Sequence, residues 1–217
     1  MPELSAHPLF ARVYERVAIA GERAGAAEHR RRLLEGLSGR VLEAGAGSGT
    51  NFAHYPQTVA EVLALEPEPY LRERAQGAAA GAPVAVTVLA GQIETIPAED
   101  ASFDAVVLSL MLCSVADQEL ALAEAFRVLR PGGELRFYEH VRSRSPAWAR
   151  LQRLADATVW PRVAGGCHMA RDTAAAIERA GFELLRCERF PFSASPALPA
   201  FPHILGAALR PVKVPGA

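Results

Sequence analysis

The segment "VLEAGAGSGTNF", from Val41 to Phe52, is the most informative part of the sequence. Glycines stand at positions 45, 47 and 49, directly after an apolar segment that carries one acid, Glu43. Because residues without a β-carbon let a ligand contact the backbone, we expect a strand ending at Ala44, a glycine turn, and a helix starting near Gly49. Such a turn binds a nucleotide-like cofactor.

Two other nucleotide-binding patterns do not fit these glycines. A P-loop needs Lys followed by Ser or Thr, which is absent here, and the dinucleotide fingerprint would place its third glycine at Thr50. In the remaining pattern, E-x-G-x-G-x-G, the Glu43 carboxylate can meet a ligand ammonium group but would repel a pyrophosphate. A tight turn of small residues without a ligand is the alternative interpretation.

The sequence around this stretch predicts an α/β fold. Short apolar runs typical of parallel strands covered on both faces are "RVLEAG", "EVLALEP", "VAVTVLAG", "FDAVVLSL" and "GELRFYEHV". Helical spacing is seen before them, in 9–17 and in "AGAAEHRRRLLEGL", between them at 70–80 and 117–129, and after them in "RDTAAAIERAG". Right-handed βαβ units are the simplest topology, and "FELLRCERF" and "HILGAALR" would add two last strands.

Composition excludes several classes of function. With 217 residues, 23 Lys and Arg against 24 Asp and Glu, and a net charge of -1, the chain suits one enzyme domain and lacks a nucleic-acid footprint. No apolar run has the length of a membrane span and no signal peptide is evident, so we expect no stable membrane insertion and a cytoplasmic location.

The cysteines Cys113, Cys167 and Cys187 form no C-x-x-C pair, which argues against structural zinc and a disulfide framework. The sequence does not determine the oligomeric state.

Glu66 ends the next strand, roughly 20 residues past the glycines. A carboxylate there can accept hydrogen bonds from both hydroxyls of a ribose. The alternative is a solvated acid at the end of a strand. Together with the glycine turn, Glu66 favours a cofactor that contains a ribose.

The order "VLEAGAGSGTNF", "ALEPEP", "GQIETIP", "FDAVVLSLMLCSV" and "AFRVLRPGGELRFYEHV" resembles the class I S-adenosylmethionine-dependent methyltransferases over nearly the whole chain. The resemblance implies a Rossmann-like α/β fold, with a seven-stranded, mostly parallel sheet, one antiparallel strand, and helices on both faces. We expect a single domain, 1–217, with N-terminal helices in 1–38 that form a lid, a cofactor-binding half in 39–140, and a cap segment with the last strands in 141–217.

The resemblance also implies the cofactor S-adenosylmethionine, with S-adenosylhomocysteine as product, and assigns residues to it by position. The methionine part would lie on Gly45, Ala46 and Gly47 with Glu43 at its amino end, the ribose on Glu66, the adenine between Pro67 and Ile93, and Ser109 and Leu110 beside the methionine. Gln92 stands where the family usually has an acid, and an amide oxygen can still accept that hydrogen bond. Phe10 and Tyr14 share one helix face and are expected in the lid.

Motifs that the sequence lacks exclude some classes of methyl acceptor. The Asn/Asp/Ser-Pro-Pro-aromatic run of base-methylating enzymes is missing after the fourth strand. A metal-dependent enzyme would need acidic ligands at the ends of this strand and the next; Ser109 is not one, and Glu139 alone is insufficient, so we expect a small molecule methylated without metal. The segment from His140 to Met169, with "LCSV", "EHV" and "PHI", resembles the animal alkyl-thiol S-methyltransferases and implies a thiol acceptor. Two alternatives stay open: O-, N- or C-methylation of a small aromatic or natural-product scaffold, and a catalytically idle cofactor-binding regulatory module.

Two histidines are candidates for the chemistry. His140 follows the fifth strand and could take the proton of a thiol, or it could merely hydrogen-bond a neighbouring loop. His168 is the second candidate. The substrate pocket is assigned to Phe10, Cys113, Trp148 and Trp160, although Cys113 in its apolar stretch also suits a small core residue.

Overall fold

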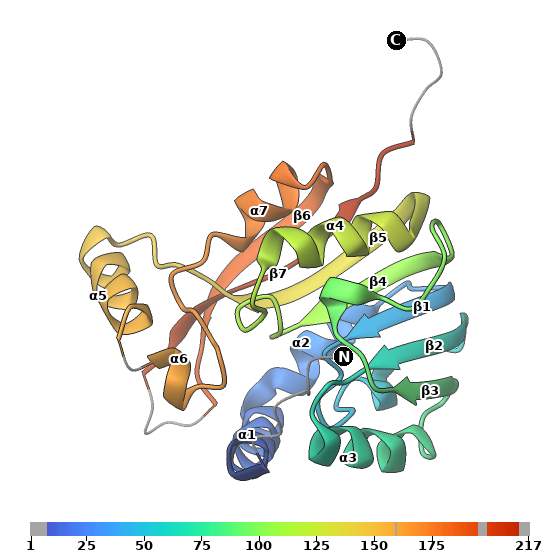
Figure 1. The fold of residues 1–217 in the computed structure, drawn as a ribbon, viewed down its shortest axis with the longest axis horizontal. Helices are drawn as coiled ribbons and strands as arrows, with labels where there is room; N and C mark the ends of the chain where they lie inside the picture. Colours follow the sequence, from blue (N-terminus) through green and yellow to red (C-terminus); the bar gives the residue numbers. More distant parts are fainter. Residues whose placement is uncertain (1–7, 159, 195–198, 213–217) are drawn as a thin grey trace.

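A computed structural model describes residues 8–158, 160–194 and 199–212 of the chain. Its centre is a seven-stranded sheet with the order β3-β2-β1-β4-β5-β7-β6 (Figure 1). The strands are β1 (Gly39–Ala44), β2 (Val59–Leu65), β3 (Ala85–Leu89), β4 (Phe103–Ser109), β5 (Leu129–His140), β6 (Glu183–Phe192) and β7 (Phe201–Leu209). Pairs among β1 to β5 are parallel, whereas β7 runs antiparallel to both β5 and β6. The expected mostly parallel sheet with one antiparallel strand is confirmed.

Helices cover both faces of the sheet, as expected. They are α1 (Pro8–Gly21), α2 (Ala27–Leu34), α3 (Pro69–Ala79), α4 (Gln118–Val128), α5 (Pro146–Asp156), α6 (Trp160–Val163) and α7 (Thr173–Arg179). Successive residues of β1 point to opposite faces: Val41 packs in one core cluster with α2 and α3, and Leu42 packs in the other with α4 and α7. No helix within the described ranges is both long and apolar enough to cross a membrane.

The chain after the glycine turn differs from the expectation. No α-helix starts near Gly49; tight turns lead instead into a short 3-10 helix, η2 (Phe52–His54). Gly49 has a positive φ of 82°, and Tyr55 is already extended because it precedes Pro56, which disfavours helical backbone at the residue before it. The segment between the glycines and the proline is therefore too short for an α-helix.

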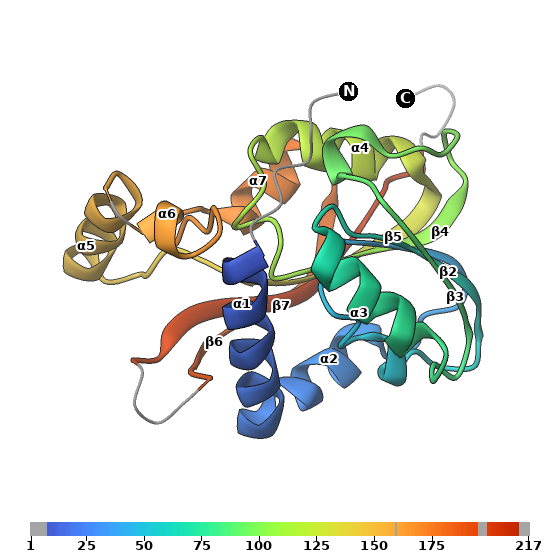
Figure 2. The ribbon, with the colours of Figure 1, turned by 60° about the horizontal axis from the view of Figure 1, so that its bottom comes forward.

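The two N-terminal helices meet at a kink. A π-helical turn, η1 (Glu22–Ala26), joins α1 to α2, and Gly25 within it has a φ of 116°. The α1 helix lies against α3, as Figure 2 shows, where the Glu15 carboxylate accepts hydrogen bonds of 2.7 Å from Tyr70 Oη and from Arg74 Nε. This contact brings α1 beside the carboxyl ends of the strands.

The segment between β5 and α7 forms α5 and α6, which stand to one side of the sheet in both ribbon views (Figures 1 and 2). Gln152 on α5 holds the two ends of this segment to the helix. Its side-chain nitrogen donates to the carbonyl oxygens of Val141 at 3.4 Å and Met169 at 3.2 Å, and its side-chain oxygen accepts from the Ser143 N–H at 2.7 Å.

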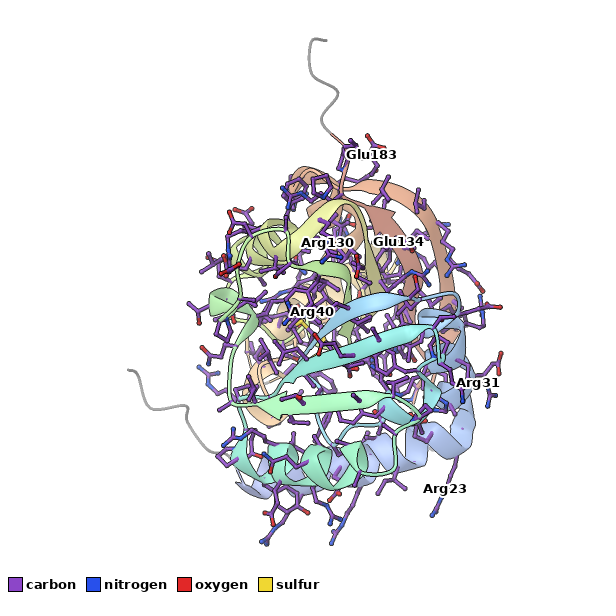
Figure 3. All side chains as sticks on the ribbon, turned by 90° about the vertical axis from the view of Figure 1, so that its right-hand side faces the viewer. Arg23, Arg31, Arg40, Arg130, Glu134 and Glu183 are labelled. Carbon is purple, nitrogen blue, oxygen red and sulfur yellow. The ribbon has the colours of Figure 1, made fainter. Side chains whose placement is uncertain are left out.

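Charged side chains gather at the amino ends of the strands, where Arg40, Arg130 and Glu134 are labelled in Figure 3. Arg40 Nε lies 2.6 Å from Glu61, and Arg130 pairs with Asp104. These pairs are partly exposed and mark the end of the sheet where the strands begin.

Candidate active site

A pocket lies at the carboxyl ends of β1 and β4, where the strand order reverses. In open α/β sheets this crevice is the usual ligand site. The pocket is lined by Tyr14, Ala18, Arg30, Glu43, Gly45, Ala46, Gly47, Ser48, Thr50, Asn51 and Ser109. Six of the expected cofactor residues, Tyr14, Glu43, Gly45, Ala46, Gly47 and Ser109, are therefore brought together here.

The glycine turn needs its glycines. Gly45 and Gly47 have φ values of 70° and 58°, in the left-handed region that side chains disfavour. A β-carbon on Gly45 would lie 2.8 Å from Met111 Cβ, whereas one on Gly47 would meet only the Tyr14 ring at 3.6 Å. The open side of the turn thus faces the pocket beneath α1.

Glu43 is buried beneath this turn. Asn51 Nδ2 donates to one carboxylate oxygen at 2.9 Å, and Tyr55 Oη donates to the other at 2.6 Å. Burial raises the pKa of Glu43 to about 7, although both hydrogen bonds oppose that shift. Each oxygen keeps a lone pair that a ligand ammonium group could use.

Glu66 lies one residue beyond the end of β2. Its carboxylate accepts hydrogen bonds from the Gly47 N–H at 2.7 Å and from the Glu68 N–H at 2.9 Å. Burial raises the pKa of Glu66 to about 7, against the effect of these two bonds. The expected ribose-binding acid therefore also supports the glycine turn.

The remaining cofactor candidates differ in exposure. Gln92 is exposed, Pro67 is half-buried, and Ile93 lies in the apolar core at 2 % exposure. Leu110 has a positive φ of 56°, which is strained for a side chain of this size, and its N–H donates to the Tyr138 carbonyl oxygen at 2.6 Å. This bend turns the chain away from β4 beside the pocket.

Sequence reasoning missed Arg30, which is buried on α2 and lines the pocket. Its Nε lies 2.6 Å from Glu22, and one terminal nitrogen donates to Asn51 Oδ1 at 2.8 Å and to Ser109 Oγ at 3.0 Å. The signal was present in "HRRRLL", because helical spacing puts Arg30 on the same face as the buried Leu33 and Leu34. Only the fold shows that this face meets the ends of the strands.

Glu139, at the end of β5, holds the loop after β4. Its buried carboxylate accepts hydrogen bonds from the N–H groups of Met111 at 3.0 Å, Leu112 at 2.9 Å and Cys113 at 3.3 Å. Burial raises the pKa of Glu139 well above its ordinary value. Glu139 therefore acts as a positioning residue for this loop.

His140 lies next to this loop, half-buried. Its Nδ1 is 3.8 Å from Cys167 Sγ, and its ring centroid is 4.2 Å from that of His203. Burial opposes the charged imidazole, but the Cys113 thiol and Glu139 outweigh burial and raise the pKa of His140. His168 adjoins the same place, since its backbone N–H donates to the Cys113 carbonyl oxygen at 2.7 Å.

The structure does not bring the residues assigned to the substrate pocket together in one pocket. Cys113 is 2 % exposed and packs with Cys167 and Trp160, so it is a buried residue, as its apolar stretch suggested. The Trp160 indole nitrogen is buried without a hydrogen-bond partner in the described part of the chain. Trp148 is 60 % exposed on α5, outside the described pocket. The Phe10 side chain lies outside the described residues.

Comparisons with known proteins agree with this geometry. Residues 42–137 match the family model described as a methyltransferase domain. A thiol S-methyltransferase of Homo sapiens, TMT1B, is 35 % identical over 182 residues, which cover 82 % of this chain and 74 % of that protein. The chain belongs to the class I S-adenosylmethionine-dependent methyltransferases. Its cofactor is therefore S-adenosylmethionine.

Solved structures show how widely the fold of this methyltransferase is used. An S-adenosylmethionine-dependent methyltransferase of Thermotoga maritima matches 92 % of this chain and 95 % of its own, with a TM-score of 0.67 and 23 % identity. The [4+2]-cyclase SpnF matches 86 % of this chain and 82 % of its own, with a TM-score of 0.68 and 19 % identity. A protein named for a cyclisation shares the fold, so the fold alone does not decide the reaction.

Proposed function

We propose that this methyltransferase transfers a methyl group from S-adenosylmethionine to a small thiol. The observation that carries this proposal is the 35 % identity, over 82 % of the chain, to a protein named as a thiol S-methyltransferase. We further propose that the partner is a small molecule, with no nucleic acid and no stable membrane insertion. The nearly balanced charge of the chain supports this choice.

The methionine end of the cofactor would bind in the pocket between β1, β4 and α1. Its ammonium group would contact Glu43, and its chain would cross Gly45, Ala46 and Gly47 beneath Tyr14, with Ser109 and Leu110 alongside. We add Arg30 as the partner of the cofactor carboxylate, because it is a buried cation lining the same pocket.

The nucleoside end would lie over the end of β2. Glu66 would accept hydrogen bonds from the ribose hydroxyls with the lone pairs that Gly47 and Glu68 leave open. Pro67 and Ile93 would flank the adenine, and Gln92 would accept a hydrogen bond from its amino group. The Gln92 side chain is exposed in this structure.

Methyl transfer would proceed in line, with the thiol sulfur, the methyl carbon and the cofactor sulfur collinear. Holding this geometry in a dry pocket supplies most of the acceleration. We propose His140 as the group that takes the thiol proton and His168 as a second candidate. Phe10, Cys113, Trp148 and Trp160 would enclose the acceptor, and Trp148 is exposed on α5 in this structure.

Two other functions remain as alternatives, and one experiment separates all three. The purified protein is given S-adenosylmethionine and a panel of alkyl and aryl thiols, phenols and amines, and S-adenosylhomocysteine is measured. Turnover of thiols supports the proposal. Turnover of phenols or amines alone means an O- or N-methyltransferase, and cofactor binding without turnover favours a regulatory module. C-methylation is tested by mass spectrometry of the products of carbon acceptors.

A further inference from the structure

Three side chains that can bind a metal ion meet near the carboxyl ends of β4 and β5. Cys113 Sγ, Cys167 Sγ and a ring nitrogen of His140 all lie within 4.8 Å of one another. They come from three separate segments: the loop after β4, the end of β5, and the loop after α6. The cluster is therefore a product of the fold and not of a local sequence motif.

Two of the three segments are loops, and each loop is held in place by hydrogen bonds other than those of the cluster. The Glu139 carboxylate fixes the Cys113 loop through three backbone N–H groups. The Asp156 carboxylate accepts from the N–H groups of Met169 at 2.9 Å and Ala170 at 2.8 Å, which fixes the Cys167 loop. A site held this way loses little freedom when an ion binds.

The distances suit a tetrahedral zinc ion. With Zn–S of about 2.3 Å and Zn–N of about 2.0 Å, tetrahedral ligand atoms are roughly 3.5 to 3.8 Å apart. The Cys167 Sγ to His140 Nδ1 distance is already 3.8 Å, and since no two of the ligand atoms are more than 4.8 Å apart, the others need to close by at most about 1 Å. Two thiolates neutralise the doubly charged ion, so the bound site carries no net charge into its buried surroundings.

We propose that Cys113, Cys167 and His140 Nδ1 bind one zinc ion and leave its fourth coordination position for a thiolate. Two cysteines and one histidine with an open position is a ligand set of catalytic zinc sites. Binding releases the two thiol protons, since thiolates are the ligands. This proposal departs from the expectation of no metal, which rested on the lack of C-x-x-C pairs and of a second acidic ligand beside Glu139.

The use of the open position by an acceptor thiol rests on the proposed function. The metal site itself does not depend on that function. An acceptor thiol bound to zinc loses its proton to solvent and becomes a thiolate, because the ion stabilises the negative sulfur. His140 is then a metal ligand, and it acts as a base only in metal-free protein. Met111, two residues before Cys113, lies where a β-carbon on Gly45 of the cofactor turn would meet it.

The metal site is tested with cobalt as a coloured substitute for zinc. The reduced full-length protein is stripped with a chelator and titrated with Co²⁺. We expect saturation at one ion per chain, visible bands of tetrahedral cobalt, and a near-ultraviolet thiolate-to-cobalt band, all removed by one equivalent of Zn²⁺. Native mass spectrometry of the zinc form should show one zinc added and two protons lost. No saturable band at equimolar cobalt overturns the site.

Substitutions assign the ligands. Cys113→Ser and Cys167→Ser should each weaken the thiolate-to-cobalt band by about half, and His140→Ala should lower the cobalt affinity by about tenfold or more. Cys187→Ser is the matched control, because Cys187 is exposed on β6, and it should leave the spectrum unchanged. Equal losses in the Cys187 control, or none in the other two cysteine variants, contradict the assignment. Far-ultraviolet circular dichroism establishes that each variant is folded.

Ethanethiol added to the cobalt protein tests the fourth position. A stronger thiolate-to-cobalt band and shifted visible bands are expected when a third thiolate binds. Unchanged bands, or loss of cobalt to the thiol, would overturn the open position. If no thiol in the acceptor panel is methylated while cobalt binding persists, the proposed function fails and the metal site stands.

Discussion

The Glu66 carboxylate accepts a hydrogen bond of 2.7 Å from the backbone N–H of Gly47, which joins the acid after β2 to the glycine turn after β1. The two features that the sequence analysis assigned to one cofactor are thus in direct contact. A ligand that binds the Glu66 carboxylate therefore also lies next to the glycine turn, because that carboxylate is hydrogen-bonded to the turn.

The first prediction concerns this acid. Glu66→Ala should weaken the binding of S-adenosylhomocysteine by about 1.5 to 3 kcal/mol, the range for hydrogen bonds to a charged group. Isothermal titration calorimetry measures the affinity. Glu61→Ala, an exposed carboxylate on the same strand, is the control and should bind normally. If Glu66→Ala also binds normally, the ribose assignment is wrong.

Arg30 should act on only one end of the cofactor. Arg30→Gln is expected to weaken S-adenosylhomocysteine by about 1.5 to 3 kcal/mol, because a buried charged partner of the carboxylate is lost. It should leave 5′-methylthioadenosine, which has no carboxylate, unaffected. Arg31→Gln, whose side chain is 59 % exposed, is the control. Equal losses for both ligands would mean that Arg30 supports the fold and does not contact the carboxylate.

Stability should fall as the pH rises through the Glu43 transition. Burial raises the pKa of Glu43 to about 7, from 4.5, so between these values the folded chain holds a proton that the unfolded chain has released. The contribution is full below about 4.5 and is lost as the pH rises past 7. Urea unfolding at pH 5, 6, 7 and 8 measures it. Glu43→Gln should flatten this slope, and an equal slope in both proteins would contradict the shift.

In metal-free protein, the loss of methylation rate caused by His140→Ala should depend on pH. A thiol of pKa about 8.5 is only a few per cent ionised near pH 7, so the loss of a base is felt most there. Above the thiol pKa the thiolate dominates and the defect should disappear. Rates of thiol methylation from pH 6 to 10 are compared with those of the unsubstituted protein. A defect that is the same at every pH would make His140 a positioning residue.

The α1 helix should become more ordered when the cofactor binds. Tyr14 lies over Gly47, with its ring 3.6 Å from the place of a β-carbon, and α1 is fastened to α3 through Glu15. Hydrogen exchange in residues 8–21 should slow on addition of S-adenosylhomocysteine. The α4 helix, packed in the core, provides the reference. Equal exchange with and without ligand would mean that α1 is a fixed cover and not a lid.

Local sequence determined the elements that place the cofactor. The strand before the glycines ends at Ala44 as expected, and α3 and α4 lie within one residue of the segments that helical spacing marked. The reason is physical: backbone geometry and the alternation of burial along a strand depend on neighbouring residues, so both can be read from the chain. The helix expected near Gly49 is absent because Pro56 and the left-handed glycine limit the segment between them.

Tertiary structure alone decided the chemistry at the ends of β4 and β5. Arg30 belongs to a run of three arginines, and only the packing of α2 against the sheet buries it beside Ser109. Cys113, His140 and Cys167 are distant in sequence and meet because β4 and β5 are neighbours and the segment after α6 folds back over them. Contacts between residues so far apart depend on the order of the strands and the path of the connections, which no local pattern of side chains encodes.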